Sequence, residues 1–234
     1  MKPEIKNIIK YTIILAVVTF AASFILSHVN RITYPNILKQ EREKQERALS
    51  VVLPGYSNIE KKKTLIDNKV YIYWIGDKIE EGKTAKGFAF ITGSSGYSGL
   101  VQSMVGIDEN GIILGLSILQ QTETPGLGAR SVEVATTETF LGYIFGSEAS
   151  TKDVSIAPWF QEQFKGLNTT KTIDILKRGD WSIKIRDELL NKNAISAITG
   201  ATITTRAVRD SIASGIKDLQ RVMLLETGSA GAEE

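Results

Sequence analysis

The chain has 234 residues, 42% of them hydrophobic, and carries 28 Lys and Arg against 26 Asp and Glu. Because there is no basic excess to neutralise phosphates, this balance argues against a nucleic-acid-binding protein. The absence of cysteine excludes disulfide frameworks, iron–sulfur clusters and thiolate zinc sites, and the single histidine argues against a histidine-rich metal centre.

The N-terminal part of the chain is predicted to cross a membrane once. Residues 8–29 are an apolar run of 22 residues whose only full charge is Lys10. As a helix, this run would span about 33 Å. Lys2, Lys6 and Lys10 stand at its start, so the positive-inside rule places the N-terminus in the cytoplasm and the bulk of the chain on the external or periplasmic side of the cell (inner) membrane. A cleaved signal peptide is the alternative, but its apolar region is usually only about 7–15 residues long. We therefore expect residues 1–30 to be a cytoplasmic N-terminus and an anchor helix.

Residues 31–53 continue as a strongly charged segment in which apolar residues are too sparse to form a core stripe. We expect a solvated stalk helix there, which ends near Pro54 and Gly55. An extracytoplasmic domain is then expected over residues 54–226. The last residues, 227–234, are small, polar and acidic, and are expected to form a disordered tail.

Four segments rich in branched and aromatic residues predict β-strands: 70–75, 87–92, 100–107 and 112–119. The last two are separated by Asp108-Glu109-Asn110-Gly111, which is typical of a hairpin turn. The pattern therefore predicts an antiparallel meander rather than a series of βαβ units.

Helical patterns follow these strands. Residues 131–143 are one candidate helix, and residues 157–166 form a short amphipathic pattern whose aromatic residues we interpret as core. A longer helix is expected at about residues 204–225, because apolar residues recur there every three or four positions. The aromatic residues are Trp159, Phe160 and Phe164, and the apolar stripe is Val208, Ile212, Ile216, Leu219 and Met223. The predicted fold class is a single N-terminal transmembrane α-helix plus an α+β domain of antiparallel sheet with flanking helices.

The segment Thr199-Gly200-Ala201-Thr202 immediately precedes the last predicted helix. A small-residue turn with free hydroxyls is, by default, a helix N-cap. It is also the place where unpaired amides and the helix dipole favour a phosphate. The residues alone leave both interpretations open.

Two glycine-rich segments, 93–99 and 124–128, interrupt the strands, and such glycines commonly do no more than permit turns. No P-loop and no dinucleotide-binding glycine pattern occurs after a strand. With His28 at the membrane face, a serine–histidine mechanism lacks its base. Glu123, as a lone loop carboxylate, is weak evidence for acid–base catalysis.

Four segments together resemble a known family: GSSGYSGLVQSMVGID, TETPGLGAR, APWFQEQFKG and AITGATIT. In this order, behind one transmembrane helix, they are similar to the FMN-binding-domain family that includes the G subunit of Rnf complexes and the C subunit of sodium-translocating NADH:quinone reductases. The run GYSGLVQSMVGID favours the Rnf branch. The resemblance implies that the α+β domain binds FMN.

In that family, the last threonine of a Ser/Thr-Gly-Ala-Thr motif carries FMN through a phosphoester installed by a flavin transferase. The resemblance assigns this role to Thr202. It implies no catalytic side chain and no metal ligand. It implies further cofactor-binding residues in three segments, which are Thr199, Gly200, Ala201, Glu123, Thr124, Pro125, Gly126, Leu127, Gly128, Tyr97, Ser98 and Gly99. The chain departs from the family pattern at Ser196, where Asp is common, at residues 120–122, which often include His or Lys, and at Leu100, where proline is frequent.

The function implied by the resemblance is that of a membrane-anchored flavoprotein electron carrier, a redox subunit of an Rnf-type ferredoxin:NAD oxidoreductase that couples electron transfer to sodium or proton translocation. Its partners would be the other Rnf subunits, including a second FMN-bearing membrane subunit, together with the flavin transferase and membrane lipid. One alternative is the quinone-reductase subunit or a related anchored flavin domain. The other is a cofactor-free anchored interaction subunit, in which the Thr199–Thr202 turn is only an N-cap.

Overall fold

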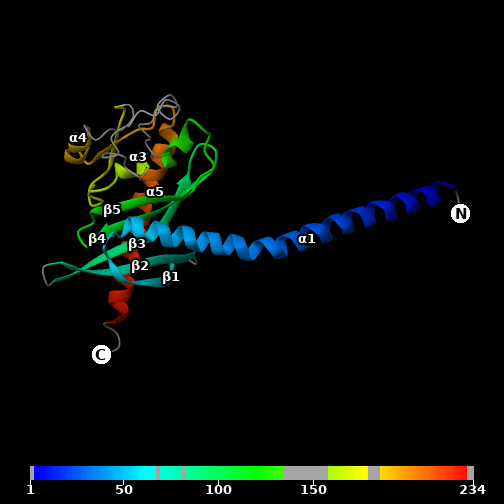
Figure 1. The fold of residues 1–234 in the computed structure, drawn as a ribbon, viewed down its shortest axis with the longest axis horizontal. Helices are drawn as coiled ribbons and strands as arrows, with labels where there is room; N and C mark the ends of the chain where they lie inside the picture. The colour runs from blue at the N-terminus through cyan, green and yellow to red at the C-terminus, as the bar shows by residue number, and fades with distance from the viewer. Residues whose placement is uncertain (1–2, 67–68, 81–82, 134–157, 179–184, 231–234) are drawn as a thin grey trace, which may run out of the picture. The chain divides into compact units, whose positions relative to one another are not determined.

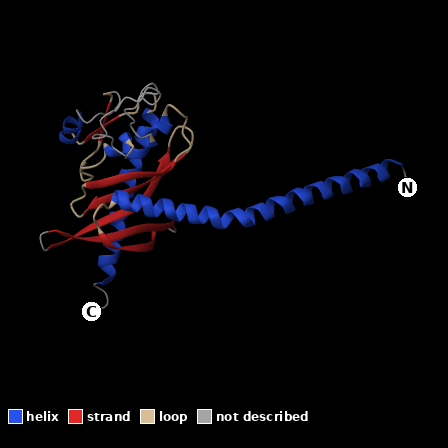
Figure 2. Cartoon of the chain, in the orientation of Figure 1, coloured by secondary structure: helices blue, strands red, loops and turns tan. Residues whose placement is uncertain are grey.

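The computed structural model describes residues 3–66, 69–80, 83–133, 158–178 and 185–230. The chain forms two units, Met1–Gln45 and Glu46–Glu234. The first unit consists of helix, and the second contains the sheet, the remaining helices and two hydrophobic cores. The α+β class expected from the sequence is confirmed (Figure 2).

Helix α1, Pro3–Val52, contains both the expected anchor and the expected stalk. Among the described residues, it is the one helix long and apolar enough to cross a membrane. The Thr19 hydroxyl donates to the Leu15 carbonyl oxygen at 2.9 Å, so this polar group is satisfied within the helix. Pro35 lies inside the helix without ending it, although a proline removes one amide from the ladder.

The sheet has five strands in the order β1-β2-β3-β4-β5, and every neighbouring pair is antiparallel (Figure 1). The strands are β1 Ser57–Ile66, β2 Lys69–Glu80, β3 Lys83–Ser95, β4 Leu100–Asp108 and β5 Ile113–Gln120. The predicted meander is confirmed. Strand β1 was not predicted, because its sequence SNIEKKKTLI lacks a run of branched or aromatic residues. Its charged residues suit its position at the edge of the sheet.

The turn between β4 and β5 forms as its sequence predicts. The Asp108 carboxylate accepts hydrogen bonds from the Asn110 and Ile112 amides at 2.9 and 2.7 Å. Gly111 has a φ of 76°, in the left-handed region that glycine adopts without strain. Local side-chain hydrogen bonds therefore support this hairpin, and the Thr169 amide and hydroxyl also donate to the Gly111 carbonyl oxygen, at 2.9 and 2.8 Å.

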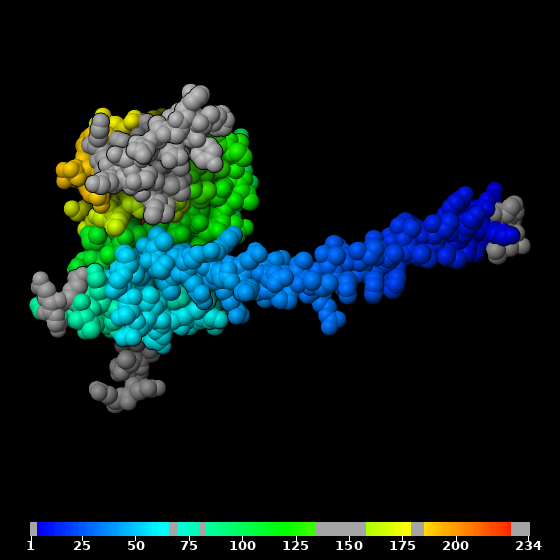
Figure 3. Space-filling model, viewed as in Figure 1, coloured from blue at the N-terminus to red at the C-terminus, as the bar shows by residue number. Residues whose placement is uncertain are grey.

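Consecutive side chains point to opposite faces of the sheet, so the second unit has two cores. One core lies against α5 and includes Tyr73, Phe90, Val105, Val208 and Ile212. The other lies beneath the C-terminal end of α1 and includes Ala48, Val52, Trp74, Ala89 and Met104. Figure 3 shows this end of α1, in cyan, lying against the strands. The sheet is thus covered by helix on both faces.

The end of α1 approaches the sheet at a pair of glycines. Gly106 in β4 and Gly115 in β5 are cross-strand partners. A Cβ atom added at Gly106 would lie 2.0 Å from the Val52 carbonyl oxygen, and one at Gly115 would lie 2.7 Å from that of Val51. The missing side chains therefore allow the helix backbone to rest directly on the strands.

The remaining elements are short except for the last. They are η1 Gly128–Val132, α3 Trp159–Glu162, β6 Asp174–Leu176, α4 Arg186–Asn191, β7 Ala194–Ser196 and α5 Thr202–Ala230. Strands β6 and β7 pair in parallel. Neither was predicted, because segments of three residues are too short to show a strand pattern in the sequence. Within the described part of the expected 131–143 helix, the chain is 3₁₀-helical to Val132, and residues 134–157 lie outside the described residues.

Two helical predictions differ in extent from the structure. Within the described residues 158–166, the expected helix is regular only over α3. Beyond it the Phe164 and Lys165 amides donate to carbonyl oxygens three residues back, at 3.3 Å each, and the chain turns at Gly166, whose φ is 90°. The aromatic residues of this segment are buried as predicted. Helix α5 begins two residues earlier than expected and includes residues 227–230, which were expected to belong to a disordered tail. Residues 231–234 lie outside the described residues.

A partly buried phenol makes the stability of this unit depend on pH in the alkaline range. The Tyr71 hydroxyl donates to the Gly215 carbonyl oxygen at 3.1 Å, and burial, with the nearby Asp218 carboxylate, raises the pKa of Tyr71 well above its usual range. Below about pH 10 the phenol is neutral in both the folded and the unfolded protein. Above that pH only the unfolded protein loses the proton, so the free energy of unfolding falls by up to about 1.4 kcal/mol per pH unit. We expect Tyr71→Phe to weaken this alkaline loss, as measured by urea unfolding on both sides of pH 10. An unchanged pH dependence in the variant would contradict the prediction.

Candidate functional site

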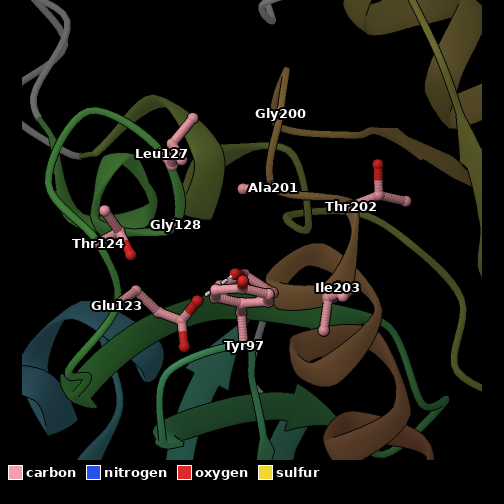
Figure 4. A pocket seen from close by; sticks show the side chains of 10 residues that line it. Tyr97, Glu123, Thr124, Leu127, Gly128, Gly200, Ala201, Thr202 and Ile203 are labelled. Atoms are coloured by element: carbon pink, nitrogen blue, oxygen red, sulfur yellow. Dashed lines mark hydrogen bonds between the residues drawn. The ribbon is translucent and has the colours of Figure 1, made fainter.

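A cavity of about 430 Å³ lies between two loops and the start of α5 (Figure 4). Its volume is within the range of roughly 300–1,000 Å³ that is usual for small-molecule sites. The loops follow β3 and β5, so the antiparallel meander brings both to the same end of the sheet. The lining residues are Tyr97, Glu123, Thr124, Leu127, Gly128, Gly200, Ala201, Thr202, Ile203 and Thr204.

The segment before α5 forms a tight turn. The Ala201 amide donates to the Ile198 carbonyl oxygen at 2.9 Å, and Gly200 has a φ of 78°, as the third residue of a type II turn requires. A Cβ atom at Gly200 would lie 2.9 Å from the Leu127 side chain. Glycine therefore both permits the turn and lets it approach the opposite loop.

Buried Thr205 fixes this turn to the helix. Its hydroxyl donates to the Ala201 carbonyl oxygen at 3.1 Å and accepts from the Ile198 amide at 3.1 Å. The Thr205 amide also donates to the Ala201 carbonyl oxygen, closing the first helical turn. These hydrogen bonds thus fix the backbone on either side of Thr202, the first residue of α5.

Thr202 is half-buried, and no hydrogen bond engages its hydroxyl among the residues that the structure describes. In Figure 4 its side chain lies at the edge of the group of lining residues. The amides of the first helical turn have no acceptors within the helix, and the helix dipole favours negative charge at this end. The arrangement therefore places an accessible hydroxyl beside a potential phosphate site.

Glu123 is the buried acidic residue of the site, with 6% of its surface exposed. One carboxylate oxygen accepts from the Ser98 amide at 3.0 Å, and the other accepts from the Thr204 hydroxyl. The Ser98 and Thr204 donors come from the β3–β4 loop and from α5, respectively. This carboxylate therefore connects three segments that are far apart in the sequence.

The structure brings together most of the residues implied by the family resemblance. Eight of them line the cavity, whereas Ser98, Gly99, Pro125, Gly126 and Thr199 lie in the same loops without lining it. Ile203 and Thr204 line the cavity and were not in the implied set. Their proximity to Thr202 in the first turn of α5 is the signal that could have included them.

The departures from the family pattern lie in different environments. Ser196 is completely buried in β7, and its amide donates to the Gln163 side-chain oxygen at 2.7 Å. Leu100 is 49% exposed at the start of β4. The residue at position 196 therefore lies inside the folded domain and not on its surface.

An accessible hydroxyl at a helix N-terminus, beside a cavity with apolar walls, defines a domain suited to a cofactor that bears a phosphate. Residues 96–217 match the family model of the FMN-binding domain, and residues 1–52 match that of the RnfG N-terminal region. The chain therefore belongs to the FMN-binding-domain family.

Known proteins resemble the chain over most of its length. It is 27% identical over 227 residues to the G subunit of the Na⁺-translocating ferredoxin:NAD⁺ oxidoreductase complex of Acetobacterium woodii, covering 93% of this chain and 94% of that protein. It is 25% identical to the G subunit of the ion-translocating oxidoreductase complex of Escherichia coli O157:H7, covering 89% of each. Among solved structures, the C subunit of the Na⁺-translocating NADH-quinone reductase of Parabacteroides distasonis aligns with a TM-score of 0.44 and 15% identity, covering 76% of this chain and 92% of that one.

The residues of the cavity fit FMN. Tyr97, Leu127 and Ile203 are 73%, 44% and 52% exposed around it, which provides apolar surface for a flavin ring. The first turn of α5 provides amides and a favourable dipole for the phosphate. These apolar side chains and the start of α5 thus line the same cavity.

Proposed function

We propose that this chain is the membrane-anchored FMN-bearing electron carrier of an Rnf-type ferredoxin:NAD oxidoreductase, with the FMN phosphate esterified to Thr202. The match of residues 1–52 to the RnfG N-terminal region and the names of relatives that cover about nine-tenths of the chain support the assignment to this complex. The same N-terminal match favours the Rnf branch over the quinone-reductase branch. The chain would act as one redox subunit of the complex and not as a catalyst by itself.

The observation that carries the proposed attachment is the Thr202 hydroxyl, which is uncommitted among the described residues and lies at the start of α5 beside the cavity. A phosphoester requires a hydroxyl, and the helix N-terminus stabilises the phosphate charge. When bound, FMN supplies the redox chemistry. Tyr97, Leu127 and Ile203 would exclude water from one part of the ring, and the backbone around Gly200 would hold the phosphate end.

A covalent tether suits a carrier outside the cytoplasm, because it keeps the local concentration of flavin high without tight binding. A single membrane-spanning helix forms no ion pathway by itself, so sodium or proton translocation would occur in the other subunits. These partners would include a second FMN-bearing membrane subunit, and a flavin transferase would act during maturation. Membrane lipid would surround the apolar part of α1.

The test is the intact mass of the full chain produced together with a flavin transferase, followed by fragment mapping. We expect a gain equal to FMN minus one water, located on the peptide that contains Thr202. An unmodified mass, under conditions that flavinylate another family member, would contradict the attachment and favour the cofactor-free interaction subunit.

The proposed orientation can be tested cleanly, because the chain has no cysteine of its own. Glu4→Cys and Lys171→Cys place single thiols at exposed positions, one before the apolar run and one in the FMN-binding domain. We expect a membrane-impermeant maleimide to label the Lys171→Cys protein in intact spheroplasts and the Glu4→Cys protein only after lysis. The reverse pattern would place the FMN-binding domain in the cytoplasm.

A further inference from the structure

The carboxylate of Glu123 lies where the two loops of the cavity meet the first turn of α5. The Ser98 amide donates to one oxygen at 3.0 Å, and the Thr204 hydroxyl donates to the other. Two protein donors from separate segments therefore hold this buried side chain in one position.

The neighbouring glycines leave room for this carboxylate. A Cβ atom at Gly96 would lie 2.4 Å from the oxygen that accepts from Ser98. A Cβ atom at Gly128 would lie 2.5 Å from the other oxygen and 2.6 Å from the Thr204 hydroxyl oxygen. One glycine from each glycine-rich segment thus packs against Glu123, which gives these two positions a role beyond forming turns.

Thr204 lies close in sequence to Thr202, the proposed flavin-attachment residue. It lies two residues after Thr202 in the first turn of α5, and it is completely buried. Thr205 holds the same turn from the interior through Ile198 and Ala201. The bond from Thr204 to Glu123 is therefore a side-chain hydrogen bond that joins the first turn of α5 to the opposite wall of the cavity.

We propose that Glu123 is a positioning residue, which fixes Thr202 relative to the two cavity loops by holding the Ser98 amide and the Thr204 hydroxyl at the same time. Its functional consequence rests on the proposed attachment of FMN to Thr202. The side chain acts through these two hydrogen bonds, which join the start of α5 to the two loops.

Four variants separate geometry from charge. Glu123→Ala removes both hydrogen bonds, and Thr204→Val removes one while keeping the carboxylate and nearly the same volume. Glu123→Gln removes the charge but keeps the geometry, because its oxygen accepts from Ser98 and its amino group donates to the Thr204 hydroxyl. Thr204→Ser keeps the hydroxyl and is the matched control for the valine variant.

The first measurement is amide hydrogen exchange in the flavin-free full chain. We expect Glu123→Ala to increase exchange in peptides that cover residues 96–99 and 200–206 by about tenfold, and Glu123→Gln to leave it within about twofold of wild type. Thr204→Val should increase exchange in residues 200–206, whereas Thr204→Ser should not. A melting temperature close to that of wild type would show that the change is local.

The second measurement is the rate of FMN transfer onto each variant by the flavin transferase. A misplaced acceptor should lower kcat while KM for the protein substrate stays unchanged, and we expect a loss of about tenfold or more for Glu123→Ala and Thr204→Val. Glu123→Gln and Thr204→Ser should remain within about twofold of wild type.

Two results would overturn the proposal: a glutamine variant as impaired as the alanine variant, which would assign the effect to charge, or a valine variant indistinguishable from wild type. The exchange measurement does not depend on flavin. If wild-type protein accepted no FMN, the proposed function would fail, while exchange would still decide whether Glu123 joins the three segments.

Discussion

Thr202→Val is expected to yield a protein that inserts into the membrane and folds normally but carries no covalent flavin. Valine replaces the hydroxyl by a methyl group and nearly preserves volume, and the Thr202 hydroxyl has no hydrogen bond to lose among the described residues. The phosphoester, by contrast, cannot form without this oxygen. Intact mass and the visible absorbance of the denatured, filtered protein measure the loss, which should be complete.

Two further variants are controls for this prediction. Thr202→Ser keeps a hydroxyl at the same place and should retain flavin, and Thr199→Val removes the exposed hydroxyl at the other end of the turn and should also retain it. Covalent flavin in Thr202→Val protein would refute the assigned acceptor and direct the search to Thr199, Thr204 or Thr205. Because Thr204 and Thr205 are completely buried, the exposed Thr199 would be examined first.

Gly106→Ala should be the most destabilising of the conservative changes in the sheet. The added Cβ would lie 2.0 Å from the Val52 carbonyl oxygen and 2.6 Å from its carbonyl carbon, and backbone atoms cannot move aside by changing rotamer. Overpacking of this kind usually costs about 1–3 kcal/mol, and each kcal/mol lowers the Tm of a domain of this size by roughly 2–4 °C. We expect the free energy of unfolding, measured by denaturant unfolding, to fall by about 3 kcal/mol.

Gly93→Ala is the graded control, because its Cβ would lie 3.1 Å from the nearest atom, the Val101 carbonyl oxygen. It should cost clearly less than Gly106→Ala. Equal stability of the Gly106→Ala and wild-type proteins would mean that the end of α1 does not rest on this strand in solution. Flavin attachment should survive in the folded fraction of both variants, since neither glycine lines the cavity.

The sequence by itself was sufficient wherever a short segment determines its own structure. The apolar run in α1, the Asp108–Gly111 hairpin and the stripe of α5 depend on composition or on contacts between near neighbours. The same holds for the motifs that carry the family resemblance, because they require particular residue types at short spacings. For this reason the meander, the last helix and the membership of the FMN-binding-domain family could be predicted from the sequence.

Only the tertiary structure decided features that depend on residues distant in the chain. Strand β1 is charged and becomes a strand by pairing with β2, and the end of α1 is covered because Gly106 and Gly115 lie beneath it. Glu123 is a lone carboxylate in the sequence, and folding brings it to Ser98 and Thr204, the latter 81 residues away. The physical reason is that local propensity acts over a few residues, whereas burial and hydrogen bonding of a polar group depend on whichever segments the fold places around it.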